Sequence, residues 1–221
     1  MGTSMICAYN NQVFILNAGH TLSMADANAL NLFVEFKDGY CFPLPPTSQF
    51  QDNGDMDIGI SPISNQEAIA WLDKGVKPLN LAAAYNSQVA NYKYLIFFGY
   101  PWRKYNPRST TPKAKFVRFS TEAIPPPFTQ NLRGKVNSDY HIIGAMPKGD
   151  VELIDEKGTR KAKLPNFEGM SGGPVFWYDP SLSPMIRFAG IGIRCLQSQY
   201  IAALNVEAII AALNSLLENQ N

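Results

Sequence analysis

The sequence has little of what would place it among charged, membrane-bound or secreted proteins. Lysine and arginine number 19 and aspartate and glutamate 18, so the net charge is +1 and no overall field favours nucleic acid or a membrane surface. No apolar run approaches the length that spans a bilayer. The chain starts with an apolar stretch that lacks the basic segment and cleavage site of a secretory leader, so we expect a cytoplasmic protein.

Cysteine is scarce as well. Cys7, Cys41 and Cys195 have no spacing typical of metal ligands, and an odd number of cysteines cannot all pair in disulfides. We therefore expect reduced and mostly buried thiols. We expect neither a metal site nor a cofactor.

Histidine is scarcer still, and only His20 and His141 are present. This matters because glycines surround Ser171 in the segment 168–176 (EGMSGGPVF), a pattern that predicts a hydroxyl on a tight turn beside backbone N–H groups. A serine hydroxyl is a poor nucleophile unless a neighbouring base takes its proton. The pattern Gly-x-Ser-x-Gly also fits the nucleophile elbow of α/β-hydrolases, but those enzymes need a histidine after the serine. No histidine follows Ser171, so we exclude that interpretation.

His20 ends an apolar run, and an acid lies further along the chain. A lone histidine is more often a core residue than a base, but the order His, Asp, Ser favours catalysis. Asp52, Asp55 and Asp57 compete for the acid role, and they lack the ligand spacing of a calcium loop. We favour Asp57, because an apolar alternation follows it, and keep Asp55 as the alternate. His141 matches no such segment, so we expect a mainly structural role for it.

Three segments now stand in order: Ala-Gly-His at 18–20, Asp-Ile-Gly-Ile at 57–60 and Gly-Met-Ser-Gly-Gly-Pro at 169–174. Together they resemble the signature segments of the trypsin-like (chymotrypsin-fold) serine peptidases, most closely the bacterial intracellular trypsin-like domains. The resemblance extends from about Ile6 to the C-terminal helix. It implies an all-β fold of two antiparallel six-stranded barrels with a C-terminal α-helix. It divides a single domain, 1–221, into a first barrel at 1–86, a second at 87–204 and a helix at 205–221.

The resemblance also implies a function. A serine endopeptidase would use His20, Asp57 and Ser171 as a triad, the N–H groups of Gly169 and Ser171 as oxyanion hole, and a protein or peptide as substrate. Trypsin-like enzymes activated by cutting carry an aspartate before the nucleophile. Here that residue is Met170, so we expect no charge-paired zymogen switch. The alternative is a latent or non-catalytic binding or sensor module of the same fold, regulated by a partner protein.

The substrate-binding residues follow from the same resemblance. They are Pro165 and Asn166 at the base of the first specificity pocket, and Gly192, Ile193 and Arg194 along its wall. No carboxylate lies at the base, so a preference for lysine or arginine is not supported. The side chain of Arg194 either favours an acidic substrate residue or points to solvent.

Local patterns predict the secondary structure around these residues. We expect strands at 5–10, 12–18 and 30–37, with a turn at Asn10-Asn11 and another at Asp38-Gly39. Further strands are expected at 94–101, 151–154, 159–164, 174–177 and 188–194, and helices at 66–74 and 205–217.

The stretch from Lys74 to Ser120 has no acidic residue but several lysines and arginines, with tyrosine and tryptophan between them. Such a stripe can hold nucleic acid. We favour solvated hairpins instead, and expect neither a nucleic-acid nor a membrane partner.

Overall fold

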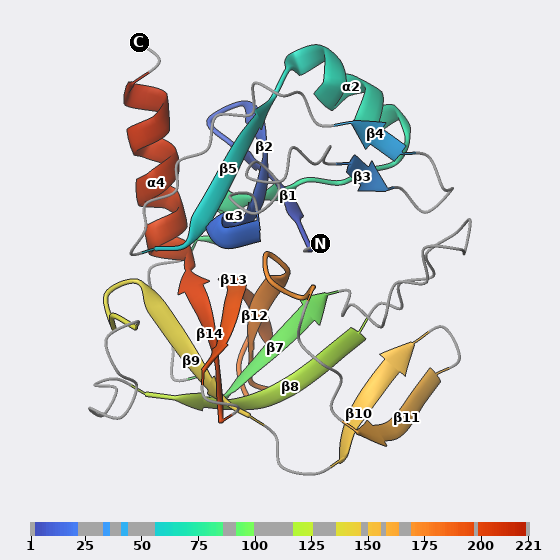
Figure 1. The fold of residues 1–221 in the computed structure, drawn as a ribbon, viewed down its shortest axis with the longest axis vertical. Helices are drawn as coiled ribbons and strands as arrows, with labels where there is room; N and C mark the ends of the chain where they lie inside the picture. The colour runs from blue at the N-terminus through green and yellow to red at the C-terminus, as the bar shows by residue number, and fades with distance from the viewer. Residues whose placement is uncertain are drawn as a thin grey trace.

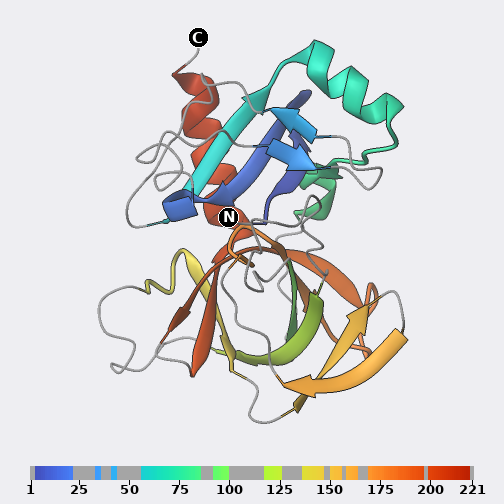
Figure 2. The ribbon, with the colours of Figure 1, turned by 45° about the vertical axis from the view of Figure 1, so that its right-hand side comes forward.

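The computed structural model describes residues 3–21, 33–35, 41–43, 56–85, 92–99, 117–125, 136–146, 150–155, 158–163, 169–196 and 199–219. Its strands form two parts, one above the other in Figure 1, and the C-terminal helix rises beside the upper part. The view in Figure 2 keeps this separation and looks into the lower part, where the strands curve round a ring.

The upper part contains a four-stranded sheet in the order β5-β2-β1-β6. Its strands are β1 (Met5–Tyr9), β2 (Gln12–Ala18), β5 (Ile58–Ile63) and β6 (Leu79–Asn80). The turn between β1 and β2 places Asn10 and Asn11 at φ of 47° and 60°, the left-handed conformation that asparagine tolerates and a two-residue hairpin needs. Ala18 pairs with Ile58, so the end of β2 and the start of β5 lie at the same edge of the sheet.

The lower part is a closed barrel of six strands in the order β12-β13-β14-β9-β8-β7. These strands are β7 (Tyr94–Gly99), β8 (Val117–Ile124), β9 (His141–Ala145), β12 (Pro174–Tyr178), β13 (Ile186–Leu196) and β14 (Tyr200–Asn205). All neighbouring pairs are antiparallel, and the pairing of β12 with β7 closes the ring. One face of each strand is therefore available for an interior core.

The remaining elements lie around these two parts. They are the antiparallel pair β3 (Phe33–Glu35) and β4 (Cys41–Pro43), the hairpin β10 (Asp150–Asp155) and β11 (Gly158–Lys163), and the helices α2 (Asn65–Asp73), α3 (Leu81–Ala84) and α4 (Val206–Glu218). Figure 1 shows β3, β4 and α2 beside the upper sheet and the hairpin beside β8 of the barrel. No helix of the described residues is long and apolar enough to cross a membrane.

The α4 helix joins the two parts. The side chain of its N-cap, Asn205, accepts a hydrogen bond from the backbone N–H of Ala208 at 2.8 Å, which satisfies a donor that the helix itself leaves unpaired. A single buried cluster contains Phe14 of the upper sheet, Ile191 of the barrel and Leu213 of the helix. Because this core is shared, the positions of the two parts are fixed relative to each other.

These observations confirm a mostly β fold with a six-stranded antiparallel second part and a C-terminal helix. Most of the predicted strands and both predicted helices are present within a few residues. The expectation of a six-stranded barrel in the upper part is not confirmed, because its described residues form a four-stranded sheet and the separate β3–β4 pair. The predicted Asp38-Gly39 turn lies outside the described residues.

Candidate active site

His20 and Asp57 are brought together at the edge where β2 ends and β5 begins. The Nδ1 atom of His20 lies 3.1 Å from Oδ1 and 3.0 Å from Oδ2 of Asp57. The backbone N–H of His20 also donates to Oδ1, at 2.8 Å. The His20 side chain is 45% exposed and that of Asp57 8%, so the ring extends from a buried carboxylate toward solvent. With Nδ1 held by the acid, the Nε2 atom is left to accept a proton.

The backbone of Asp57 is held in an uncommon conformation. Its φ is +55°, in the left-handed region that few residues other than glycine, asparagine and aspartate adopt. Its carbonyl accepts a hydrogen bond from the N–H of Gly19 at 2.8 Å, next to the N–H of His20 that binds the carboxylate. Strain of this kind persists only where the surroundings impose it, and here it aims the acid at the imidazole.

Burial alone would raise the pKa of Asp57. The hydrogen bonds from the side chain and backbone of His20, and the nearby charges of His20 and Arg194, outweigh burial and hold the pKa of the carboxyl group below its usual range. Asp57 is therefore ionised at neutral pH and can stabilise a positive charge on the imidazole.

The serine segment forms a tight turn between the two parts of the fold. Gly169 and Gly172 have φ of +91° and +90°, conformations that glycine adopts without strain. A Cβ atom on Gly172 would lie 2.0 Å from the backbone oxygen of Thr3 and 2.4 Å from Oδ1 of Asn17. Asn17 precedes His20 by only three residues, so the turn is packed against the strand that delivers the histidine.

Several hydrogen bonds fix the serine turn. The N–H of Gly172 donates to the carbonyl of Gly192 at 2.6 Å, and the N–H of Gly192 donates to the carbonyl of Gly173 at 2.8 Å. From the other side, the N–H of Thr3 donates to the carbonyl of Ser171 at 2.9 Å, and the Thr3 hydroxyl donates to the carbonyl of Gly169 at 2.7 Å. The turn is thus held by β13 of the barrel and by the segment before β1.

Met170 anchors the same turn through packing. Its side chain is 5% exposed and belongs to a buried barrel cluster with Leu95, Phe97 and Phe119. The absence of an acid at this position is thus matched by an apolar environment, in which an unpaired carboxylate would be unfavourable.

The hydroxyl of Ser171 donates to the carbonyl of Ile193 at 3.0 Å. Within the part of the chain that the structure describes, no hydrogen bond joins Ser171 to His20. The N–H groups of Gly169 and Ser171, the predicted oxyanion donors, likewise have no hydrogen-bond partner among the described residues. The hydroxyl must rotate from Ile193 toward the imidazole before it can lose its proton.

The residues expected along the substrate wall have other partners. Both backbone groups of Gly192 are bonded to the serine turn, and Ile193 is buried and accepts the Ser171 hydroxyl. The guanidinium of Arg194 neither points to solvent nor stands free for a substrate, because Nη2 donates to Oδ2 of Asp57 at 3.0 Å. Pro165 and Asn166, with the alternate acid Asp55, lie outside the described residues.

His141 lies inside the fold, as its expected structural role requires. It is 2% exposed, and its Nδ1 atom lies 2.9 Å from the backbone nitrogen of Asn137 and 3.1 Å from that residue's carbonyl oxygen. Its pKa is lowered by burial, and the charge of Arg194 acts in the same direction. The hydrogen bond with Asn137 and the charge of Asp57 act in the opposite direction, but less strongly.

The sequence indicated neither Thr3 nor Asn17 as part of this site. Asn17 binds locally, through its side-chain oxygen to the N–H of Ala18 and through its side-chain nitrogen to the hydroxyl of Ser4. Both Thr3 and Asn17 are buried polar residues, yet no sequence motif marks them. Only the tertiary packing of the serine turn gives them a place in the site.

Neither the cysteine thiols nor a cluster of metal-binding side chains forms a second candidate site among the described residues. Cys7 is buried as expected, and burial raises the pKa of its thiol to about 12, whereas Cys195 is exposed and departs from the expectation of buried thiols. The Cys41 side chain lies outside the description. The described residues contain no group of three or more His, Cys, Asp or Glu placed to hold a metal ion.

A scan against protein-family models and a search of curated proteins find no match to this chain.

Proposed function

We propose that this protein is a serine endopeptidase that hydrolyses peptide bonds in proteins through His20, Asp57 and Ser171. The observation that carries the proposal is the placement of a serine turn against the strand that ends at a histidine–aspartate pair. The turn contacts Asn17 through Gly172, and Asp57 lies within hydrogen-bond distance of both the ring and the backbone of His20. Such a constellation is typical of acyl transfer.

The proposed reaction begins when the Ser171 hydroxyl turns toward Nε2 of His20. The imidazole takes the hydroxyl proton as Oγ attacks the peptide carbonyl, and Asp57 stabilises the imidazolium through Nδ1. The N–H groups of Gly169 and Ser171 stabilise the oxyanion that forms. The imidazolium then gives its proton to the leaving amine, and water hydrolyses the acyl-enzyme with His20 again as the base.

We also propose that the chain has the trypsin-like fold of two barrels with the site between them. The six-stranded barrel supplies Ser171, and the upper sheet supplies His20 and Asp57. This division of the three residues between two β parts supports the proposal.

A second candidate is a latent module of the same fold that acts only when a partner protein opens it. The bond from the Ser171 hydroxyl to the carbonyl of Ile193 favours it, because in this state the nucleophile is turned away from its base. A partner or substrate that displaces this bond would complete the triad.

Hydrolysis of fluorescein-labelled casein tests the proposal. We expect the wild type to release soluble fluorescence, and Ser171→Ala and His20→Ala to release none. Asparagine tolerates the left-handed φ of residue 57 as aspartate does, so the Asp57→Asn variant should fold. It should retain only about one part in 10⁴ of the wild-type rate. A folded wild type that neither cuts casein nor reacts with a fluorophosphonate would favour the latent module, because its serine is not activated. Equal hydrolysis by Ser171→Ala would contradict both candidates.

A further inference from the structure

The carboxylate of Asp57 is held from two sides, and one side belongs to Arg194. On Oδ1 it accepts the backbone N–H of His20 at 2.8 Å. The Oδ2 atom accepts a hydrogen bond from Nη2 of Arg194 at 3.0 Å. The imidazole Nδ1 lies 3.1 Å from Oδ1 and 3.0 Å from Oδ2. Without the guanidinium, Oδ2 would be held by the imidazole alone. Arg194 thus fixes the oxygen, and with it the plane of the carboxylate, that receives the ring N–H.

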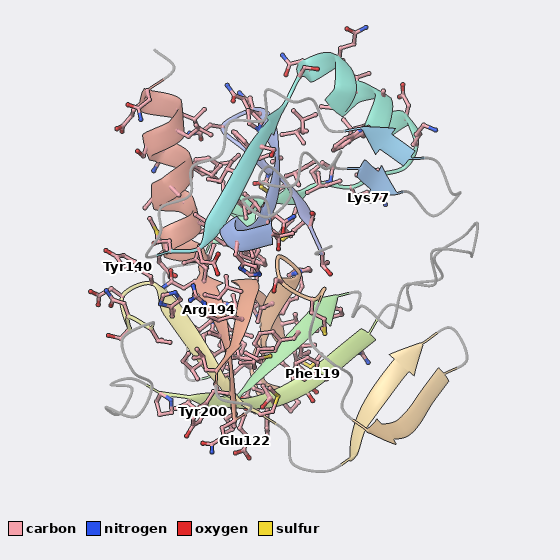
Figure 3. The ribbon with its side chains drawn as sticks, in the orientation of Figure 1. Lys77, Phe119, Glu122, Tyr140, Arg194 and Tyr200 are labelled. Atoms are coloured by element: carbon pink, nitrogen blue, oxygen red, sulfur yellow. The ribbon has the colours of Figure 1, made fainter. Side chains whose placement is uncertain are left out.

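Arg194 reaches this carboxylate from the other part of the fold. It lies on β13 of the barrel, directly after Ile193, whose carbonyl accepts the Ser171 hydroxyl. Figure 3 shows Arg194 at the end of the barrel that faces the upper sheet. One strand therefore contacts the nucleophile through residue 193 and the acid through residue 194. The position of the acid is coupled to the position of the serine.

The contact is poorly explained as a stabilising salt bridge. The Arg194 side chain is only 26% exposed, and its Nε atom is buried without a hydrogen-bond partner among the described residues. Desolvating a guanidinium and leaving one donor unpaired opposes the Coulomb gain, so a buried pair of this kind is weak evidence for stability. A role in orienting Asp57 accounts for the geometry better.

We propose that Arg194 is a positioning residue, which holds Asp57 in the orientation that fixes the His20 ring for proton transfer from Ser171. The inference rests on the proposed function, since it concerns the same reaction. Arg194 touches neither the nucleophile nor the substrate in this role; it acts through the carboxylate. Because the guanidinium is bonded to the acid, it is not the recognition group for an acidic substrate residue.

The charge of Arg194 has a separate consequence for the pH dependence of the reaction. The charged or titratable groups that face it are Asp57 before β5, His20 after β2 and His141 on β9, and burial keeps His141 neutral. The positive charge of Arg194 is one of the causes that lower the pKa of Asp57. Removing it should let the carboxyl group take up a proton at higher pH, while loss of orientation should lower the maximal rate.

The test measures second-order rate constants for fluorophosphonate labelling across pH 5–9, with the probe as pseudo-substrate. In Arg194→Met we expect the plateau to fall about tenfold, which corresponds to one lost charge-assisted hydrogen bond. The midpoint of the acid limb should move to higher pH, because the positive charge beside the Asp57 carboxylate is lost. Arg194→Lys keeps the charge, so its midpoint should stay near that of the wild type while its plateau recovers in part.

Arg187→Met is the matched control, because Arg187 lies on the same strand and stacks over Tyr92, 5.9 Å from the ring centroid, away from the site. It should label like the wild type. If Arg194→Met fails to fold, Arg194→Lys decides, and a labelling plateau equal to that of the wild type would overturn the proposal. A folded Arg194→Met with the plateau and midpoint of the wild type would overturn it too. Faster labelling by Arg194→Met would also overturn it, because the ion pair would then restrain the site instead of positioning it. A wild type that never labels contradicts the proposed function itself, and the positioning role with it.

Discussion

Replacing Thr3 by valine should slow the reaction of Ser171 from the opposite side of the serine turn. Thr3 is 6% exposed, and its hydroxyl donates to the carbonyl of Gly169 at 2.7 Å. Valine removes this donor and leaves a buried carbonyl without it, which costs about 1–3 kcal/mol.

We therefore expect Thr3→Val to lower the free energy of unfolding by about 1–3 kcal/mol. If half of that loss falls on the reactive conformation of the turn, fluorophosphonate labelling should slow about two- to twelvefold. Urea unfolding and labelling rates, measured on the same samples, separate the two effects. Thr3→Ser keeps the hydroxyl and should stay close to the wild type in both. A Thr3→Val protein that loses stability but labels at the wild-type rate would refute the idea that Thr3 supports the oxyanion turn.

Two further predictions concern stability. Gly173→Ala should destabilise the fold by at least about 2 kcal/mol, because the new Cβ atom would lie 1.9 Å from the backbone oxygen of Phe98. The Cβ atom of Gly75→Ala would meet no atom within 4 Å, so this variant should lose only about 1–2 kcal/mol, which comes from the left-handed φ of +81°. Urea unfolding compares the two; equal losses would show that the turn can relax. Burial lowers the pKa of His141, so the unfolded chain binds more protons there, and stability should fall below about pH 6.5, by up to about 1.4 kcal/mol per pH unit. His141→Asn, which keeps a polar atom near the Nδ1 position, should flatten that slope, and an unchanged slope would assign it to other groups.

Local patterns predicted the elements that carry the candidate site. The Asn10-Asn11 turn and the apolar residues on either side of it predicted β1 and β2, because turn chemistry and strand patterning act over few residues. The glycines around Ser171 predicted a tight turn, which the positive φ values of Gly169 and Gly172 show. These features depend on a residue and its near neighbours.

The contacts that orient the site were beyond such patterns. Arg194 and Asp57 are 137 positions apart and meet only because β13 of the barrel faces the upper sheet. Thr3 and Gly169 are 166 positions apart. A resemblance in short segments names residue types but not the rotamers that join them, which is why the bond from Ser171 to Ile193 was not foreseen. Tertiary packing decides each of these contacts.

The most direct test of the central claim is the intact mass of the protein after reaction with a fluorophosphonate. The wild type should gain the mass of one phosphonyl group, and fragmentation should place it on Ser171. Ser171→Ala should gain none, and His20→Ala, with its serine intact, should gain almost none, since only an activated hydroxyl reacts at a useful rate. Equal modification of His20→Ala, or an adduct on another residue, would contradict the claim that His20 and Asp57 activate Ser171.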